Sequence, residues 1–277
     1  MNNKIKNVPM ISVIMGIYNC EKTVEAAIMS IINQTYQDFE LILCDDGSID
    51  GTYDIAKKYQ DKYPEKIILI RNDKNRGLNY TLNHCLKYAK GKYIARMDAD
   101  DESLPNRFEV EVNYLESHPE IAIISASLRL FDNDGVWGEK HFKQYPEPID
   151  LVKSSPFSHS VCMVRSEAYK AVNGYSEGKK LMRVEDLHLW IKMYSKGYRG
   201  ANLSEYLYMY RDDRDGYTKR KFKYRLNSAY VRRQAVKMFH LPKYNYIYTF
   251  TPIIIGLIPF GLYVKLHKRK LNKGEKK

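Results

Sequence analysis

Three carboxylates within four residues, Asp98, Asp100 and Asp101, are the side chains best suited to chemistry. Carboxylates held this close repel one another, and a divalent cation that also contacts phosphate oxygens would offset the repulsion. The segment therefore predicts a site for a divalent cation that also binds phosphate oxygens. The alternative is a solvated acidic loop.

A second acidic segment, residues 45–52, begins with Asp45 and Asp46. Gly47 permits a tight backbone turn, and Asp50 can cap a helix that follows. Turns rich in Asp and Gly are common where strands end. Taken alone, the segment is equally compatible with an ordinary turn and with a ligand-binding loop.

A third acidic pair, Glu185 and Asp186, opens a segment (185–194) whose apolar residues recur at the spacing of a helix face. The pair is expected at the helix N-terminus, where the helix dipole favours an ionised carboxylate. Helix capping is the alternative role for these side chains.

Four short apolar runs, each typical of a β-strand, alternate with segments of helical periodicity; they are residues 10–18, 39–44, 66–70 and 92–97. Strands joined by crossover helices form a parallel sheet, so the chain is expected to be an α/β protein. Ligands of such sheets bind at the carboxyl ends of the strands. Both aspartate-rich loops are therefore expected at the ligand-binding edge.

The second half of the chain has a mixed pattern. A helix is expected from Pro105 to Ser117, then a strand over 121–131 and a turn at DNDG. We expect a catalytic domain over 1–218, with a nucleotide-binding half at about 8–101 and an acceptor half at about 102–218, followed by a tail over 219–277.

Composition and charge narrow the function classes. The chain has 277 residues, 44% of them hydrophobic, which suits one large domain with an appendage. The net charge is +12, but residues from 219 onward hold sixteen Lys and Arg against one acid, so residues 1–218 carry −3. A slightly acidic catalytic part argues against nucleic acid, and a basic tail beside an apolar run favours an anionic lipid surface.

Cysteine placement and the first residues indicate the compartment. The four cysteines are scattered, without the spacing of a zinc site or a disulfide framework. The first ten residues lack the apolar stretch of a secretory signal. A cytoplasmic location for the catalytic part is therefore expected.

Five motifs, in this order, carry a family resemblance: SVIMGIYN, LILCDDGSIDGT, RGLNYTLNHCL, YIARMDADDESLPNRF and RVEDLHLWIKMYSKGYR. Over nearly its whole length the chain resembles glycosyltransferase family 2 enzymes of the GT-A (nucleotide-diphospho-sugar transferase) fold, especially the EpsE-type enzymes of bacterial exopolysaccharide and biofilm operons. The resemblance implies a mostly parallel central sheet flanked by helices and an inverting transfer from a nucleotide sugar.

The resemblance also implies roles for single residues on the nucleotide side. Asp46 matches the aspartate that reads a uracil base, with Asp45 as a less certain partner. Ile17 and Tyr18 border the base, although burial in a strand is an equally good account of them. Arg76 would contact either the nucleotide or solvent.

At the reacting centre the resemblance assigns Asp98 to the sugar or ribose and Asp100 to the metal, with Asp101 as a spare. Glu185 and Asp186 match the family's Glu-Asp pair, and Asp186 matches its catalytic base. Such a base takes the proton of the acceptor hydroxyl, while the metal neutralises charge on the leaving group.

Two further residues have less certain counterparts in the family. His159 matches a histidine on the acceptor side, and a structural role is equally compatible with it. Arg211 lies where the family has a mobile arginine-containing loop that closes over phosphates. Here acidic residues replace the usual histidine and serine, which weakens that assignment.

The tail contains twenty-one residues without charge, 244–264, long enough to span a bilayer as a helix. Pro252, Gly256, Pro259 and Gly261 would interrupt such a helix, and basic residues flank it on both sides. A re-entrant or interfacial element at the membrane is therefore expected. A buried helical hairpin is the alternative.

These observations together predict an inverting, Mn- or Mg-dependent transferase that moves a sugar from a UDP-sugar to a lipid-linked oligosaccharide. It would serve exopolysaccharide or capsule assembly at the inner face of the cell membrane, with possible protein partners in an assembly complex. The alternatives are a nucleotidyltransferase and a membrane-associated interaction or regulatory protein that uses the same fold.

Overall fold

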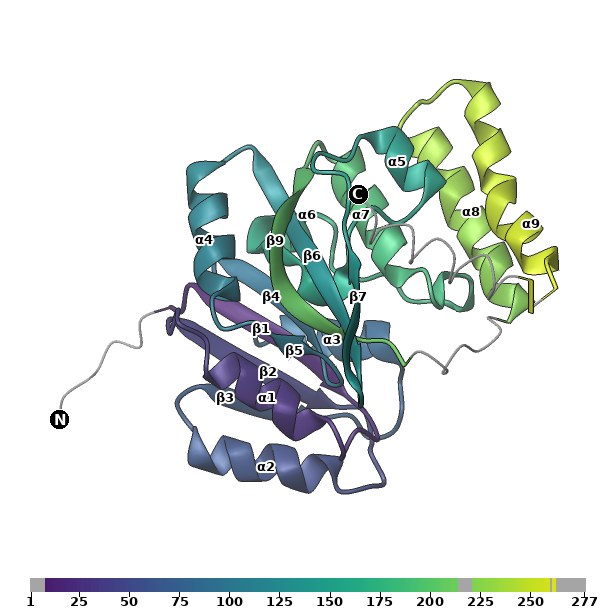
Figure 1. Ribbon diagram of the computed structural model, residues 1–277. Helices are drawn as coiled ribbons and strands as arrows, with labels where there is room; N and C mark the ends of the chain where they lie inside the picture. Colours follow the sequence, from purple (N-terminus) through teal and green to yellow (C-terminus); the bar gives the residue numbers. More distant parts are fainter. Residues whose placement is uncertain (1–7, 214–220, 260, 263–277) are drawn as a thin grey trace.

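The computed structural model describes residues 8–213, 221–259 and 261–262. One continuous sheet runs through the described chain in the order β3-β2-β1-β4-β8-β6-β9-β5, and β7 pairs with β6 off this path (Figure 1). Helices cover both faces of the sheet. The C-terminal helices form a further layer at one side of the molecule.

The first half is the predicted parallel α/β unit. Its strands are β1 (Ile11–Ile17), β2 (Phe39–Asp45), β3 (Ile67–Arg71) and β4 (Tyr93–Asp98), all parallel to one another. The connecting helices are α1 (Val24–Ile32), α2 (Thr52–Lys62) and α3 (Leu78–Leu86). The four predicted strands are thus confirmed.

Alternating side chains of the central strands supply two cores. Ile11, Val13 and Met15 of β1 pack with α1 and α2 on one face, whereas Ile14 packs with α3 on the other. Burial on both faces explains why these strands are continuous apolar runs. The register sets Ile17 beside Asp45 and Gly16 beside Asp98, so both aspartate-rich loops leave the same sheet edge.

The second half extends the sheet with mixed pairings. β5 (Glu102–Ser103), β6 (Ile121–Asp132), β7 (Gly135–Lys140), β8 (Met163–Arg165) and β9 (Arg199–Arg211) are added, and β6 pairs parallel to β9 but antiparallel to β7 and β8. α4 (Arg107–Ser117) begins two residues later than expected from Pro105. The turn predicted at DNDG joins β6 to β7.

Three short helices complete this half: α5 (Pro148–Lys153), α6 (Ser166–Ala171) and α7 (Glu185–Ser195). Trp190 and Tyr194 of α7 are buried in the second core, as their spacing predicts. Glu185 and Asp186 therefore lie in the first turn of a helix that the core anchors.

The tail consists of α8 (Phe222–Met238), η3 (Lys243–Phe250) and α9 (Thr251–Leu257). Val231, Ala235 and Val236 of α8 are buried in the second core, and η3 and α9 pack on α8. Pro252 does not interrupt a helix but lies in the first turn of α9, a position where proline loses no hydrogen bond.

The predicted boundary at residue 218, Val264 and the basic residues after it lie outside the described residues. Within the described segments, the helices all fall short of the length and apolar character needed to cross a membrane.

Candidate active site at the carboxyl edge of the sheet

The carboxylates of Asp98, Asp100 and Asp101 gather at the end of β4. One oxygen from each lies within 4.8 Å of the others, a spacing that fits one divalent cation. Burial and then the charge of Asp98 raise the pKa of Asp100, and burial and both neighbouring carboxylates raise the pKa of Asp101. The group is therefore costly without added positive charge.

Asp101, the residue regarded as a spare, is the most buried of the three. One of its oxygens accepts a hydrogen bond of 2.8 Å from the backbone N–H of Arg211, and the other is buried without a hydrogen-bond partner. Such an orphaned oxygen costs free energy unless something binds it. Asp101 therefore belongs with Asp100 among the groups able to hold a metal.

A buried arginine that sequence reasoning missed supplies part of the counter-charge. Both amino nitrogens of Arg96 contact Asp98, and only 3% of Arg96 is exposed. Burial alone would lower the pKa of Arg96, but the charge and hydrogen bond of Asp98, together with the nearby Tyr208 and Tyr175, outweigh burial and the pKa is raised. In the sequence, Arg96 is the single charged residue inside the apolar run YIARM, and this placement was the available signal of its role.

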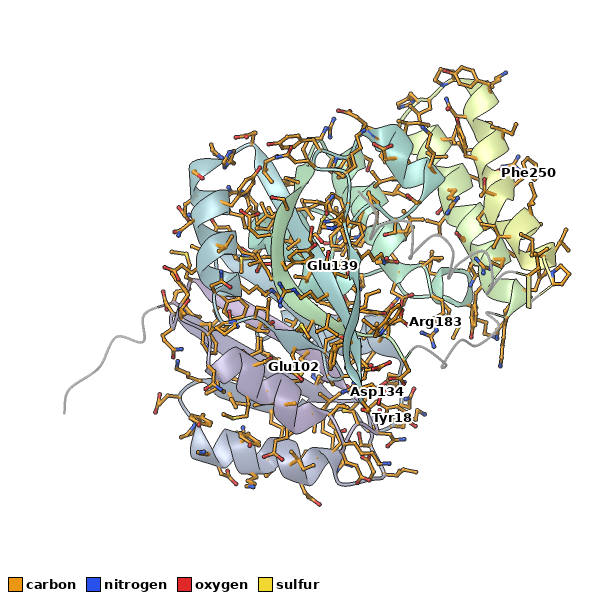
Figure 2. All side chains as sticks on the ribbon, viewed as in Figure 1. Tyr18, Glu102, Asp134, Glu139, Arg183 and Phe250 are labelled. Atoms are coloured by element: carbon orange, nitrogen blue, oxygen red, sulfur yellow. The ribbon has the colours of Figure 1, made fainter. Side chains whose placement is uncertain are left out.

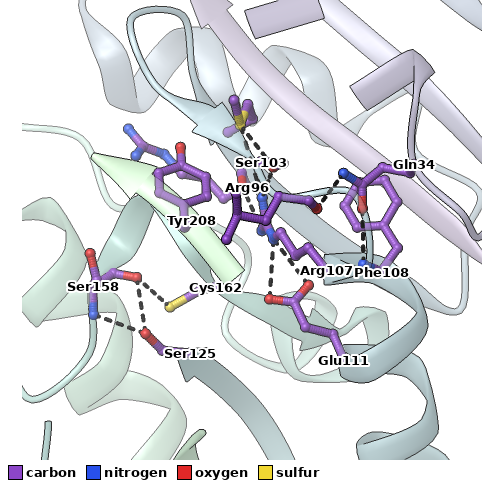
Figure 3. Close-up of polar contacts among 12 residues, drawn as sticks. Gln34, Arg96, Ser103, Arg107, Phe108, Glu111, Ser125, Ser158, Cys162 and Tyr208 are labelled. Atoms are coloured by element: carbon purple, nitrogen blue, oxygen red, sulfur yellow. Dashed lines mark hydrogen bonds and ion pairs between the residues drawn. The ribbon is translucent and has the colours of Figure 1, made fainter. Parts of the chain in front are cut away.

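Arg107 braces the strand that carries this ion pair (Figure 3). Its side chain is fully buried and donates to the backbone carbonyl of Arg96 at 3.0 Å and to Ser103 Oγ at 2.8 Å. Its Nε lies 3.2 Å from Glu111 on the next turn of α4. Arg107 thereby links β4, β5 and α4, and β4 and β5 flank the acidic loop.

Asp46 and Asp45 differ sharply in their surroundings. Asp46 accepts three hydrogen bonds of 2.8 Å, from the Asn72 amide and from the backbone N–H groups of Arg76 and Gly77. Asp45 is fully buried, and its carboxylate pairs with Arg71 at 2.8 Å. The three hydrogen bonds hold the Asp46 carboxylate at the wall of a cavity, whereas the Asp45 carboxylate stabilises the fold through its ion pair with Arg71.

A cavity of about 570 Å³, here called the Asp46 cavity, combines several residues predicted for the nucleotide. Besides Asp46, its wall includes Ile17, Tyr18, Arg76 and Glu185. The guanidinium of Arg76 bonds to Asp73 at 3.0 Å. Ile17 is buried and Tyr18 is 45% exposed, so Tyr18 presents the more accessible ring.

A second cavity, of about 1010 Å³, is here called the Asp186 cavity. Asp98, Asp100, His159, Glu185 and Asp186 all line it, so five predicted residues from three distant segments meet there. Glu185 lines both cavities. Burial, with a contribution from the charge of Asp186, raises the pKa of Glu185.

Ser155 is a second residue that sequence reasoning missed. Its hydroxyl donates a hydrogen bond of 3.0 Å to one carboxylate oxygen of Asp186. The contact fixes the rotation of that carboxylate and leaves its other oxygen for a further partner. No local pattern in the sequence distinguishes this serine from its neighbours.

His159 faces the Asp186 cavity from a buried aromatic network. Its Nε2 lies 2.7 Å from the Tyr175 hydroxyl, and its ring contacts Trp190 edge-on. Burial and the charge of Arg96 hold the pKa of His159 well below its usual value. The imidazole is therefore neutral at neutral pH.

Arg211 connects the end of β9 to the acidic loop. Its backbone binds Asp101, and its guanidinium contacts Asn133 at 3.0 Å and stacks over Phe131. It also lines a cavity of about 640 Å³ that Tyr18, Asp98 and Asp100 share. Residues 214–220, which follow, lie outside the described residues.

Comparison with known proteins relates the chain to one enzyme family. The profile of the family described as Glycosyl transferase family 2 matches residues 12–172. The chain is 42% identical over 263 residues to EpsE of Bacillus subtilis (strain 168), covering 95% of each protein. It is 29% identical over 236 residues to UDP-Glc:alpha-D-GlcNAc-diphosphoundecaprenol beta-1,3-glucosyltransferase WfaP of Escherichia coli, covering 83% of this chain and 89% of WfaP.

The fold also has solved counterparts. The crystal structure of S. aureus TarS 1–349 in complex with UDP-GlcNAc aligns with a TM-score of 0.66 at 19% identity, covering 87% of this chain and 72% of TarS 1–349. This likeness shows that the curled, mixed sheet with flanking helices is the GT-A fold. The protein therefore belongs to glycosyltransferase family 2 and is a glycosyltransferase.

Proposed function

We propose that the protein transfers a sugar, with inversion, from a UDP-sugar to a lipid-linked oligosaccharide in exopolysaccharide or capsule assembly at the inner face of the cell membrane. One observation carries the proposal: Glu185 lines both the Asp46 cavity and the Asp186 cavity, so the two candidate substrate sites share a wall. A donor and an acceptor need such contiguous sites to react.

Donor binding is assigned to the Asp46 cavity and the acidic loop. Asp46 would accept a hydrogen bond from the base, and Tyr18 would cover it. Asp100 and Asp101 would hold Mn or Mg, which when bound neutralises charge on the leaving diphosphate. Asp98, oriented by Arg96, would bind the sugar or ribose. The complex of TarS with UDP-GlcNAc supports a UDP-linked donor.

The chemical step needs one base. Asp186 takes the proton of the acceptor hydroxyl while that oxygen forms a bond to the anomeric carbon. The bond from the anomeric carbon to the donor phosphate oxygen breaks on the opposite face, and UDP leaves with the electron pair. Ser155 holds Asp186 in place through the 3.0 Å hydrogen bond. His159, being neutral, would donate or accept one hydrogen bond to the acceptor sugar.

The charge pattern of the Asp186 cavity supports an acceptor with an anionic group. Its inner wall is acidic, whereas Lys140, Arg183 and Lys221 also line it from three separate segments. Arg183 has a backbone φ of 64°, an unfavourable conformation for arginine that is more common at functional sites. The name of WfaP specifies a diphosphate-linked acceptor, which these cations would suit.

The deciding experiment measures UDP release from a panel of UDP-sugars by detergent-solubilised protein with Mn, with Mg and with EDTA. We expect metal-dependent release with one donor, and more of it when a polyprenyl-diphosphate-linked sugar is added. Asp186→Asn should bind UDP normally and release almost none from the donor. Folded protein whose melting temperature responds to no nucleotide would refute the proposal.

A further inference from the structure

The segment η3–α9 turns its large apolar side chains outward. Tyr244, Ile247, Phe250, Ile254 and Leu257 are 74%, 68%, 55%, 61% and 71% exposed. Their spacing of three residues along the 3-10 helix and of four and three along α9 puts them on one side. Figure 2 shows Phe250 on the outer side of this layer, away from the sheet. These five residues are called the η3–α9 stripe.

The inner side of the same segment is mixed: Tyr246 and Tyr248 pack against the second core and Pro252 is buried, but polar residues are buried there too. Asn245 and Thr249 are only 4% and 6% exposed, and their side chains bond to backbone carbonyls of the same segment, at 3.0 and 2.7 Å. A helix at the surface of a water-soluble domain usually turns apolar residues inward and polar residues outward. Burial of these polar side chains while large apolar side chains stay exposed indicates that water is not the only medium the stripe meets.

The neighbouring helix continues this apolar surface. Phe222, Leu226 and Tyr230 of α8 recur every four residues and are 43%, 48% and 40% exposed. α9 lies directly against α8 at Gly256, where a methyl group would come within 3.0 Å of the Phe222 ring. The outward apolar side chains of the two helices thus adjoin, and contiguous patches of this kind mark interaction sites.

The charge of the C-terminal layer indicates the kind of partner that it binds. Residues 221–259 contain seven Lys and Arg and no Asp or Glu. Apolar residues that enter the acyl region beside cations that meet headgroups are the features of an interfacial membrane element. We propose that the η3–α9 stripe inserts into the headgroup and upper acyl region of a bilayer rich in anionic phospholipid, with α8 lying beside it. This inference rests on the membrane location in the proposed function and identifies the surface that would make the contact. Membrane binding can be tested without measuring transfer activity.

The first test is flotation of the full chain with vesicles of phosphatidylcholine alone or mixed with phosphatidylglycerol. We expect binding to the mixed vesicles that falls as salt is raised. The variant Ile247→Ser/Ile254→Ser/Leu257→Ser should lower the partition coefficient at least about 100-fold, roughly five- to tenfold for each side chain. Val136→Ser on β7, also exposed at 55%, is the matched control and should bind as the wild type does. Equal binding by the triple variant would overturn the proposal, as would absence of vesicle binding by wild type.

A second test separates insertion from surface adhesion or a protein partner. Ile254→Trp should show blue-shifted emission with the mixed vesicles and quenching by brominated acyl chains, beyond any change in the wild type. An unquenched tryptophan on vesicle-bound protein would overturn insertion. Metal-dependent UDP release in detergent is measured on the same variants. If none of the proteins, wild type included, shows this release, the result would count against the transferase proposal and leave the membrane result unaffected.

Discussion

Arg96 and Asp98, two residues apart on β4, form an ion pair that uses both amino nitrogens of the guanidinium and both oxygens of the carboxylate. The pair holds Asp98 at one orientation before any ligand arrives. It also supplies a fixed positive charge beside three carboxylates, a charge that the sequence argument had assigned wholly to a metal. A bound metal would therefore add to this charge.

Removal of the Arg96 charge should destabilise the fold and the site together. Arg96→Gln is expected to lower the free energy of unfolding by about 3 kcal/mol, because a carboxylate is left without its buried partner. Arg96→Lys keeps the charge without the two-point contact, so its free energy of unfolding should lie between those of the wild type and Arg96→Gln. Urea denaturation measures the effect, and added Mn should restore part of the loss in Arg96→Gln. Unchanged stability of Arg96→Gln would contradict this account.

The Asp186 carboxylate and its hydrogen-bond donor should differ in kinetic effect. Asp186→Asn is expected to lower kcat roughly 100- to 10,000-fold, because general-base catalysis contributes that much. Ser155→Ala loses one hydrogen bond worth about 1 kcal/mol, so kcat should fall roughly fivefold with the KM for the donor unchanged. Steady-state kinetics with the donor concentration varied and the acceptor saturating measures kcat and donor KM for both variants. A Ser155→Ala effect confined to donor KM would argue against positioning of Asp186.

Metal binding should depend on Asp100 and on pH. Thermal shift with UDP should show Mn-dependent stabilisation in the wild type, about 2.7 kcal/mol at a concentration 100-fold above Kd, and little in Asp100→Asn. Because burial and Asp98 raise the pKa of Asp100, and a ligand carboxylate must be deprotonated, Mn affinity should begin to fall at a higher pH than it would with a carboxyl of ordinary pKa. EDTA should reverse the shift. An Asp100→Asn protein with wild-type Mn affinity would remove Asp100 from the site.

Acid sensitivity should trace in part to His188 on α7. Burial, and then the charge of Lys192, lower the pKa of His188 to about 4. Between that value and the unfolded pKa of about 6.5, the unfolded chain binds a proton that the folded protein does not, so stability falls as pH falls. The loss by pH 5 should be about 1 kcal/mol, allowing for partial exposure of the ring. Urea midpoints of wild type and His188→Asn at several pH values measure it, and parallel curves would exclude this residue.

Local sequence patterns were enough to predict the first half of the fold. The runs ending at Asp45 and Asp98 are apolar on both faces, and their side chains can be buried only in a sheet covered by helices on both sides. Once the sheet is parallel, both aspartates must end at one edge. The α7 helix, with Glu185 and Asp186 at its start, follows equally from a spacing within ten residues.

The tail was less predictable, because composition alone cannot orient a helix. The uncharged run over 244–264 was compatible with interfacial insertion and with a buried hairpin. The structure buries Asn245 and Thr249 and exposes Ile247 and Leu257. That choice depends on which side of η3 and α9 meets α8, a tertiary contact that no hydropathy average contains.

The sequence by itself determined the family, the α/β class, the parallel strands and the identity of the acidic groups, since each is written in neighbouring residues or in a strand period. Only the tertiary structure decided that Ser155 bonds Asp186, that Asp45 turns to Arg71 while Asp46 faces a cavity, and that Glu185 lies between two cavities. Each of these relations joins residues at least 26 positions apart in the sequence. Their geometry depends on how the packed sheet and helices bring those segments together.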